Sequence, residues 1–144
     1  MPFERITTCL WFQDQAEEAA NYYVTTFAPY SKINTLPGQE TERVMAVEFE
    51  LQGRTFVALN GGAVPWQFNE AISMVVNCKD QAEVDYYWEK LSKNGDASRQ
   101  QSGWLADKYG NDVFGDKAGV GRLTAAMMKM KKFDIAELEK AFKG

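Results

Sequence analysis

The feature that most constrains the fold of this chain is a strand-then-helix pattern that occurs twice. The mostly apolar run ITTCLWF (6–12) has the length of a strand and precedes a helical pattern over 14–27. The run AISMVVN (71–77) precedes a second helical pattern over 79–91 in the same way. A shift of 64 residues, from position 22 to position 86, superimposes the tyrosine pairs of the two helices, Tyr22-Tyr23 and Tyr86-Tyr87. We therefore expect an internal structural repeat.

The segment 44–62, which follows the first helix, predicts a long β-hairpin. Gln52-Gly53 would form its two-residue turn, with Leu51 paired to Arg54. With the segment SKINTL (31–36) as a further strand, the first copy reads as one strand, one helix and three strands. The hairpin register places six residues on one face: Met45, Val47, Phe49, Phe56, Ala58 and Asn60.

Capping signals set the expected ends of the helices. Asp14, with Glu17 three residues later, predicts the start of the first helix. Asn94-Gly95 predicts the end of the second helix. The C-terminal tail carries two further helical patterns, over 122–131 and over 135–142, the second of them capped by Asp134.

The composition excludes several classes of protein. At 144 residues and 45% hydrophobic, the chain is sized for one domain with a substantial core. The absence of histidine removes the commonest metal ligand and the usual general base near neutral pH. A net charge of −4 disfavours nucleic acid and anionic membranes as partners. We therefore expect neither nucleic acid nor membrane among the partners of this protein.

The cysteines and the N-terminal residues indicate the compartment. Cys9 and Cys78 lie in apolar stretches without C-x-x-C spacing, so we expect two buried free thiols. The N-terminus MPFERITT has no apolar leader segment, and no run approaches the roughly 18 apolar residues of a membrane span. These features predict a cytoplasmic protein.

The glycine-rich stretch GNDVFGDKAGVGRL (110–123) has only a partial match to a phosphate-binding loop. Asp116 separates the second glycine from Lys117, and Ala118 replaces the hydroxyl group that would hold Mg²⁺. The residues before it, LADKY, are too polar for the buried strand that such a loop must follow. We expect a connecting segment here and no nucleotide site.

Seven segments resemble the PhnB-like branch of the vicinal oxygen chelate superfamily, which includes glyoxalases, bleomycin resistance proteins and dioxygenases. They are ITTCLWF, AEEAANYY, VEFELQGRTFVALNGG, FNEAIS, EVDYYWEKLS, GWLADKYG and MKMKKFDIAELEKAF. Relatives carry a label as 3-demethylubiquinone methyltransferases. The sequence has no glycine-rich cofactor turn between a parallel strand and a helix, so we expect no methyltransferase activity.

The resemblance implies an α+β fold in a single glyoxalase-like domain, 1–144. Its two βαβββ modules would form curved, mostly antiparallel sheets. The second module would have a shortened last strand, with a stub at 112–114 and an exposed edge. The expected parts are module one at about 4–62, module two at about 69–116, and a C-terminal helical tail at about 122–143.

The shared chemistry of the superfamily is a divalent metal that chelates two neighbouring substrate oxygens in the cup of a sheet. Carried over to this chain, the first-strand ligand positions fall at 7–9 and 71–73, and a fourth-strand position falls at or beside Asn60. None of these positions offers the histidine or glutamate of a stable site. The resemblance therefore implies no metal of the usual kind and no cofactor.

Aromatic residues and amides near the expected cup are the candidate ligand-binding groups. Phe49 and Phe56 would share a face of the hairpin with Asn60, although both residues fit a role in the core at least as well. Stacked aromatic rings with a few amides suit a planar or cationic small molecule. The candidate ligand-binding residues are Trp11, Asn60, Phe68, Asn69 and Trp104.

The leading functional hypothesis is a small-molecule-binding protein without metal or catalysis. We expect it to act as a homodimer, because a stunted second sheet would gain a partner strand. The alternative is a metal-dependent isomerase, lyase or dioxygenase-like enzyme of the same superfamily with an oxygen-ligated divalent ion. A third reading is an interaction module whose aromatic residues form a subunit interface.

Overall fold

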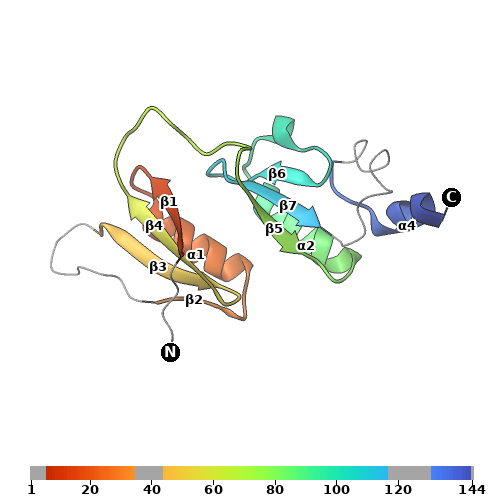
Figure 1. The fold of residues 1–144 in the computed structure, drawn as a ribbon, viewed down its shortest axis with the longest axis horizontal. Helices are drawn as coiled ribbons and strands as arrows, with labels where there is room; N and C mark the ends of the chain where they lie inside the picture. Colours follow the sequence, from red (N-terminus) through yellow and green to blue (C-terminus); the bar gives the residue numbers. More distant parts are fainter. Residues whose placement is uncertain (1–5, 35–43, 117–130, 144) are drawn as a thin grey trace. The chain divides into compact units, whose positions relative to one another are not determined.

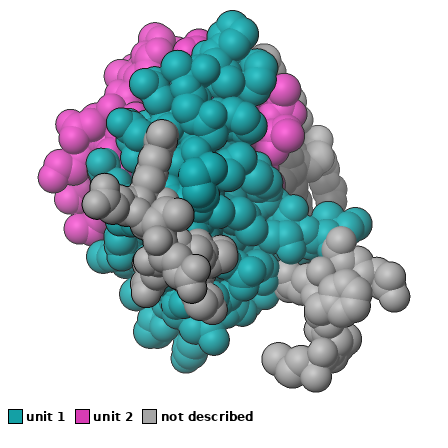
Figure 2. All heavy atoms as spheres, turned by 90° about the vertical axis from the view of Figure 1, so that its left-hand side faces the viewer, with its two compact units in different colours: residues 1–66 teal, residues 67–144 magenta. Residues whose placement is uncertain are grey.

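The computed structural model of this protein describes residues 6–34, 44–116 and 131–143. The chain forms two compact units, unit 1 with residues 1–66 and unit 2 with residues 67–144, which Figure 2 draws in different colours. Each unit contains a β-sheet of mixed strand direction that packs against a helix. The fold class is therefore α+β, as predicted.

Unit 1 consists of a four-stranded sheet and one helix (Figure 1). Its elements in chain order are β1 (Thr8–Phe12), α1 (Ala16–Thr26), β2 (Ser31–Ile33), β3 (Ala46–Leu51) and β4 (Arg54–Asn60). The strand order in the sheet is β1-β4-β3-β2, with β1 parallel to β4 and the other pairs antiparallel. The predicted order of one strand, one helix and three strands is confirmed.

The β3–β4 hairpin has the predicted register. Leu51 pairs with Arg54 across the turn at Gln52-Gly53. Both turn residues have positive φ, 49° at Gln52 and 88° at Gly53, as a two-residue hairpin turn of the favoured twist requires. This turn fixes which residues of β3 and β4 share a face.

One face of the hairpin forms the core of unit 1. Val47 and Phe49 on β3 and Ala58 on β4 are fully buried there, and Met45 at the margin is exposed. The ring of Tyr23 on α1 stacks on Phe49 with 6.2 Å between ring centroids. Three buried alanines of α1 let the helix approach the sheet closely: Ala16, Ala19 and Ala20.

The predicted start of the first helix is wrong in its capping residue. Gln15 occupies the N-cap position and its side chain makes no capping hydrogen bond, while Asp14 is exposed outside the helix. The backbone N–H of Ala16 instead donates to Oδ1 of Asn60 at 2.8 Å. The side-chain amide of Asn60 on β4 therefore caps α1 in place of the predicted Asp14.

Unit 2 contains a three-stranded sheet. Its elements are β5 (Ser73–Asn77), α2 (Gln81–Ser92), η1 (Ala97–Arg99), β6 (Trp104–Ala106), β7 (Asp112–Asp116) and α4 (Ile135–Lys143). The strand order is β5-β7-β6, with β5 parallel to β7 and β7 antiparallel to β6. Among the described residues, this sheet has one strand fewer than the sheet of unit 1.

The helices of unit 2 lie close to their predicted ranges: α2 begins two residues after the predicted start at 79 and ends one residue late at Ser92, and α4 begins at Ile135 as predicted. The Asp80 side chain accepts from the N–H of Glu83 at the start of α2, and Asn94 beyond its end has a φ of 61°. Asp134 caps α4 by accepting from the N–H of Glu137. The helix predicted over 122–131 falls on residues outside the described part of the chain, except for its last residue.

The last strand is longer than the predicted stub. It runs from Asp112 to Asp116, and all five of its residues pair with β5. It lies between β5 and β6, so it is the central strand of the sheet. The rest of the glycine-rich stretch, 117–123, falls outside the described residues.

The two cysteines differ in environment. Cys78 is buried, and burial, followed by the nearby charges of Glu83 and Asp80, raises the pKa of its thiol to about 11. Cys9 is exposed on β1, so the prediction of two buried thiols is wrong for this residue. The side chains of Cys9 and Leu10 point to opposite faces of β1, and that of Leu10 faces the core.

Candidate functional site

The structure separates the aromatic residues that the sequence analysis grouped in one cup. Trp11 pairs with Leu59 in the β1–β4 ladder, whereas its neighbours Leu10 and Phe12 pair with the buried residues Ala58 and Asn60. Because side chains alternate along a strand, Trp11 lies on the face of the sheet opposite α1. Phe49 lies on the helix-facing side, stacked between Phe56 and Tyr23. Phe49 is therefore a core residue of unit 1, and Phe56 is partly buried against it.

Trp11 packs tightly at the end of β1. Its indole N–H donates to the carbonyl oxygen of Gly62 at 3.1 Å, and its ring meets Trp66 edge to face at 5.6 Å. A Cβ at Gly61 would lie 2.1 Å from the Trp11 ring, so glycine is required for this contact. Trp66 itself is 60% exposed and leaves part of this aromatic pair open to solvent.

Asn60 has a buried side chain whose two polar groups are both hydrogen-bonded. Oδ1 accepts from the N–H of Ala16 at 2.8 Å, and Nδ2 donates to the carbonyl oxygen of Val44 at 3.0 Å. These two bonds tie β4 to the start of α1 and to the residue two before β3. The Asn60 amide thus links three segments of unit 1 by hydrogen bonds.

The other three predicted site residues belong to unit 2. Phe68 is half-buried and Asn69 is exposed, in the segment that leads to β5. The Asn69 side chain accepts from the N–H of Ala71 at 2.8 Å and so shapes the turn before the strand. Trp104 begins β6, and its ring stacks on Phe114 of β7 at 4.0 Å. Trp104 remains 37% exposed.

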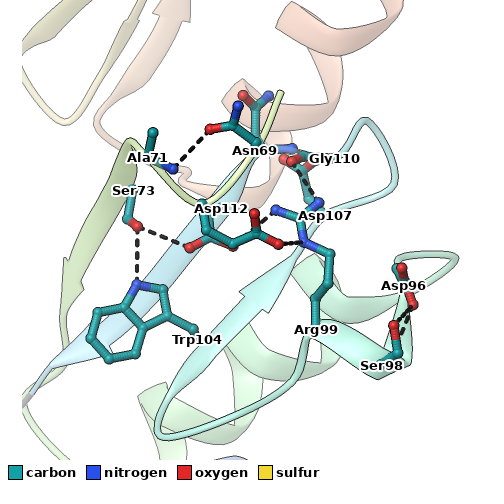
Figure 3. A network of polar contacts seen from close by, with 12 residues as sticks. Asn69, Ala71, Ser73, Asp96, Ser98, Arg99, Trp104, Asp107, Gly110 and Asp112 are labelled. Carbon is teal, nitrogen blue, oxygen red and sulfur yellow. Dashed lines mark hydrogen bonds and ion pairs between the residues drawn. The ribbon is translucent and has the colours of Figure 1, made fainter. Parts of the chain in front are cut away.

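A polar network connects Trp104 to a buried carboxylate (Figure 3). The indole N–H of Trp104 donates to Oγ of Ser73 at 3.0 Å, and the Ser73 hydroxyl donates to Oδ2 of Asp112 at 2.9 Å. Ser73 and Asp112 are directly paired in the β5–β7 ladder, which explains why their side chains meet on one face of the sheet. Asp112 is 3% exposed.

Arg99, from η1, completes the network. One terminal guanidinium nitrogen donates to the carbonyl oxygen of Gly110 at 3.1 Å, and the other donates to Oδ1 of Asp112 at 3.2 Å. The Nε atom lies 2.7 Å from a carboxylate oxygen of Glu70, a residue that is mostly exposed. The cluster thus joins one cation to two carboxylates.

These residues line an open depression of about 510 Å³ in unit 2. The indole of Trp104 and the hydrogen-bonded pair of Ser73 and Asp112 are both part of its lining. Arg99 and Glu70 form its charged end. The depression is lined by Glu70, Ser73, Ser98, Arg99, Gln101, Ser102, Trp104 and Asp112. An aromatic wall beside a few fixed polar groups is the usual composition of a small-molecule site.

Burial dominates the electrostatics of Asp112. Removal of its carboxylate from water raises the pKa above the ordinary value of 3.8, although the hydrogen bond from Ser73 and the charge of Arg99 oppose this shift. Glu70 adds to the increase because it is a second negative charge nearby. Asp112 therefore binds a proton more tightly in the folded state than in the unfolded state.

This shift predicts how stability depends on pH. A raised folded-state pKa stabilises the fold below the unfolded-state value, and the contribution is lost as the pH rises through the folded-state value. The stability of the wild type relative to Asp112→Asn should therefore increase as the pH falls from 7 to 4, measured by urea denaturation at each pH. Asp96 is the control because hydrogen bonds from Ser98 lower its pKa, so the advantage over Asp96→Asn should shrink on acidification. A shrinking advantage over Asp112→Asn would contradict the prediction.

The positions carried over from the metal ligands of the superfamily are occupied by other interactions. The Ser73 hydroxyl bonds to Trp104 and Asp112, and the Asn60 amide bonds to backbone groups. In the described part of the chain, no group of three or more cysteine, aspartate or glutamate side chains converges as a metal site would require. None of the helices within the described ranges is both long and apolar enough to cross a bilayer.

The sequence predicts the indole of this depression but not its charged groups. Trp104 is one of the predicted ligand-binding residues, and Ser73 falls among the first-strand metal positions that lack a proper ligand. Glu70, Arg99 and Asp112 carry no local motif. The pairing of β5 with β7, which brings Asp112 to Ser73, joins residues 39 apart in sequence. The only signal that the sequence offers for these charged groups is that Asp112 lies in an expected strand.

Comparisons with known proteins agree on the family and the fold. The sequence model of the family described as 3-demethylubiquinone-9 3-methyltransferase matches residues 4–112. A PhnB protein from Bacillus cereus has a similar solved structure, with 27% identity, a TM-score of 0.66, and coverage of 78% of this chain and 100% of that one. No curated protein matched the sequence.

Two more distant structures share the fold. Protein PA1353 from Pseudomonas aeruginosa has 16% identity and a TM-score of 0.60, over 79% of this chain and 100% of that one. The fosfomycin resistance protein FosX from Mesorhizobium loti has 11% identity and a TM-score of 0.58, over 87% of this chain and 99% of that one. At these identities the likeness concerns the fold, which is the glyoxalase-like fold of the vicinal oxygen chelate superfamily.

Proposed function

The chain belongs to the family described as 3-demethylubiquinone-9 3-methyltransferase, and from that membership we propose that it is a PhnB-like protein that binds a small molecule in the depression of unit 2. The observation that carries this proposal is the convergence of Trp104, Arg99 and Asp112 on one open hollow of about 510 Å³. A carboxylate with a pKa raised by burial, next to a charged partner in a hollow, is a candidate for a functional site.

The depression has two ends of different chemistry, which suggests how a ligand lies in it. Trp104 stacks on Phe114 and offers a partly exposed indole for a flat or apolar group. Arg99 and Glu70 offer charged groups at the other end. A ligand with one flat apolar part and one polar part fits this arrangement.

The proposal does not include methyl transfer, although the family description names it. A methyltransferase needs a glycine-rich turn between a parallel strand and a helix to hold its cofactor. Here β1 is joined to α1 by Gln-Asp-Gln (13–15), and β5 is joined to α2 by Cys-Lys-Asp (78–80). Neither junction contains a glycine.

We also propose that the ligand binds without a metal ion, to a homodimer in the cytoplasm. The engaged side chains of Ser73 and Asn60 support the first part. The second sheet supports the dimer, because its three strands lack an equivalent of β2 among the described residues. The free thiols of Cys9 and Cys78 suit a reducing compartment.

Native mass spectrometry of the freshly purified protein tests the ligand, the absence of a metal ion and the dimer in one measurement. We expect the mass of two chains plus a co-purifying small molecule, without a stoichiometric divalent ion. The ligand should be lost in Trp104→Ala and weakened in Trp104→Phe, because phenylalanine keeps an aromatic ring but cannot donate to Ser73. Trp66→Ala is the control, since Trp66 is an exposed tryptophan of unit 1.

Distinct outcomes would contradict distinct parts of the proposal. A tightly bound divalent ion at one per chain would refute the metal-free site. A monomer that retains the ligand would refute the dimer alone. Equal loss of the ligand from the Trp66 and Trp104 variants would remove the support for a site in unit 2.

A further inference from the structure

Two hydrogen-bond acceptors of unit 2 fix the position of the Arg99 guanidinium group. The carbonyl oxygen of Gly110 and the carboxylate of Asp112 each accept from one terminal nitrogen of the guanidinium group. Asp112 cannot easily turn away, because its side chain is 2% exposed and its other oxygen accepts from Ser73. The plane of the guanidinium group, and hence the direction of its Nε–H, is fixed by these contacts.

The Nε–H of Arg99 lacks a hydrogen-bond acceptor among the described residues, although its atom is buried. Glu70 Oε1 lies only 2.7 Å from Nε, but the N–H does not point at that oxygen. The contact is therefore an ion pair without a directed hydrogen bond. A buried charged donor without an acceptor is costly, so this position favours an incoming oxygen atom.

Glu70 is the replaceable member of the cluster. Its side chain is 65% exposed, and it lies in the turn just before β5. The Glu70 carboxylate is held by this one contact at a mostly exposed position, whereas the buried carboxylate of Asp112 is anchored on both oxygens. Movement of the Glu70 side chain into solvent would uncover Nε without breaking the Asp112 and Gly110 contacts.

We propose that Arg99 receives the carboxylate of a small carboxylic acid, and that Glu70 occupies this position in the free protein and is displaced by the ligand. This inference rests on the proposed function and names the ligand class for the same depression. A ligand carboxylate replaces the Glu70 carboxylate one for one, so the charge around Arg99 is unchanged. It gains the directed Nε–H bond that Glu70 does not make.

The position of Trp104 defines the rest of the ligand. The indole is linked to Arg99 through Ser73 and Asp112, so it lies at a fixed place beside the charged end. A carboxylate at Arg99 therefore leaves the attached group next to an exposed aromatic surface. The ligand class is a carboxylic acid with a flat or apolar body.

Three probes with one body and different polar groups test this inference: phenylacetate, phenylacetamide and phenethylamine. We expect phenylacetate to bind at least about tenfold more tightly than the other two, measured by titration calorimetry and by shifts of the Trp104 indole N–H resonance. Its affinity should fall as the salt concentration rises.

Variants of Glu70 and Arg99 distinguish displacement of Glu70 by the ligand from a simple attraction between Arg99 and the ligand carboxylate. Glu70→Gln should bind phenylacetate about two- to fivefold more tightly, because the competing carboxylate is gone. Glu89→Gln changes the net charge equally on the exposed surface of α2 and should leave the affinity unchanged. Arg99→Lys keeps the charge but removes the fixed guanidinium donor, and should weaken phenylacetate binding about tenfold. The Glu70 variant decides the matter even where the Arg99 variant folds poorly.

The failure of this inference differs from the failure of the proposed function. Equal or tighter binding of phenylacetamide or phenethylamine would keep the depression as a binding site and overturn the carboxylate assignment. Unchanged or weaker phenylacetate binding by Glu70→Gln would overturn the displacement. If none of the three probes bound in the millimolar range, the carboxylate assignment would fall, whereas the proposed function falls only if no co-purifying ligand depends on Trp104.

Discussion

Replacing Asn60 by alanine is expected to lower the free energy of unfolding of unit 1 by about 2–4 kcal/mol. The substitution leaves the buried N–H of Ala16 and the carbonyl oxygen of Val44 without their partner. It also removes the hydrogen bond with which the Asn60 side chain caps the start of α1, where Gln15 makes no capping bond. Urea denaturation in a background with Trp88 and Trp104 replaced by phenylalanine would follow unit 1 through its own two tryptophans.

Asn60→Asp separates the two hydrogen bonds of Asn60. The carboxylate still accepts from Ala16, but it cannot donate to the Val44 oxygen and repels it. The loss of stability should shrink at acidic pH, where the protonated carboxyl group donates again. A loss below about 0.5 kcal/mol for Asn60→Ala would show that the amide has no structural importance.

Replacing Gly95 by alanine is expected to destabilise unit 2 by about 3 kcal/mol. The added Cβ would lie 2.0 Å from the backbone oxygen of Ala106 on β6. Because the atom it meets belongs to a strand, no side-chain rotation can relieve the overlap. Fluorescence-detected urea denaturation that reports Trp88 and Trp104, with Trp11 and Trp66 replaced by phenylalanine, would measure the loss.

Gly53→Ala is the matched comparison for this substitution. A Cβ at Gly53 meets nothing within 4 Å, but its φ of 88° strains any other residue. It should cost unit 1 about 1 kcal/mol. If Gly95→Ala cost no more than Gly53→Ala, the close approach of the 94–95 turn to β6 would be refuted. That approach positions the strand that carries Trp104.

The parts of the fold that follow from neighbouring residues could be predicted. The register of the β3–β4 hairpin follows from a two-residue turn, and that turn determines every pair up to Ala46 and Leu59. The cap of α4 follows from Asp134, three residues before the N–H that it accepts from. In both cases the contact that decides the structure joins residues only a few positions apart. The more distant pairs of the hairpin follow from its turn.

The parts that depend on distant residues could not be predicted. The cap of α1 comes from Asn60, which is 44 residues away from Ala16, so Asp14 was a plausible but wrong choice. Trp11 was placed with Phe49 because both are aromatic, whereas the ladder of β1 with β4 puts them on opposite faces. The Arg99–Asp112 pair likewise depends on where β7 enters its sheet.

The central place of β7 has a consequence for the order in which unit 2 assembles. β5 and β6 are not paired with each other, and each is joined to the sheet only through β7. A chain emerging from the ribosome therefore has no sheet in this unit until residues 112–116 have been synthesised, and α2 must wait for the surface it covers. The match to the family ends at residue 112, where this strand begins. The sheet of the second module is thus completed only when β7 pairs with both β5 and β6.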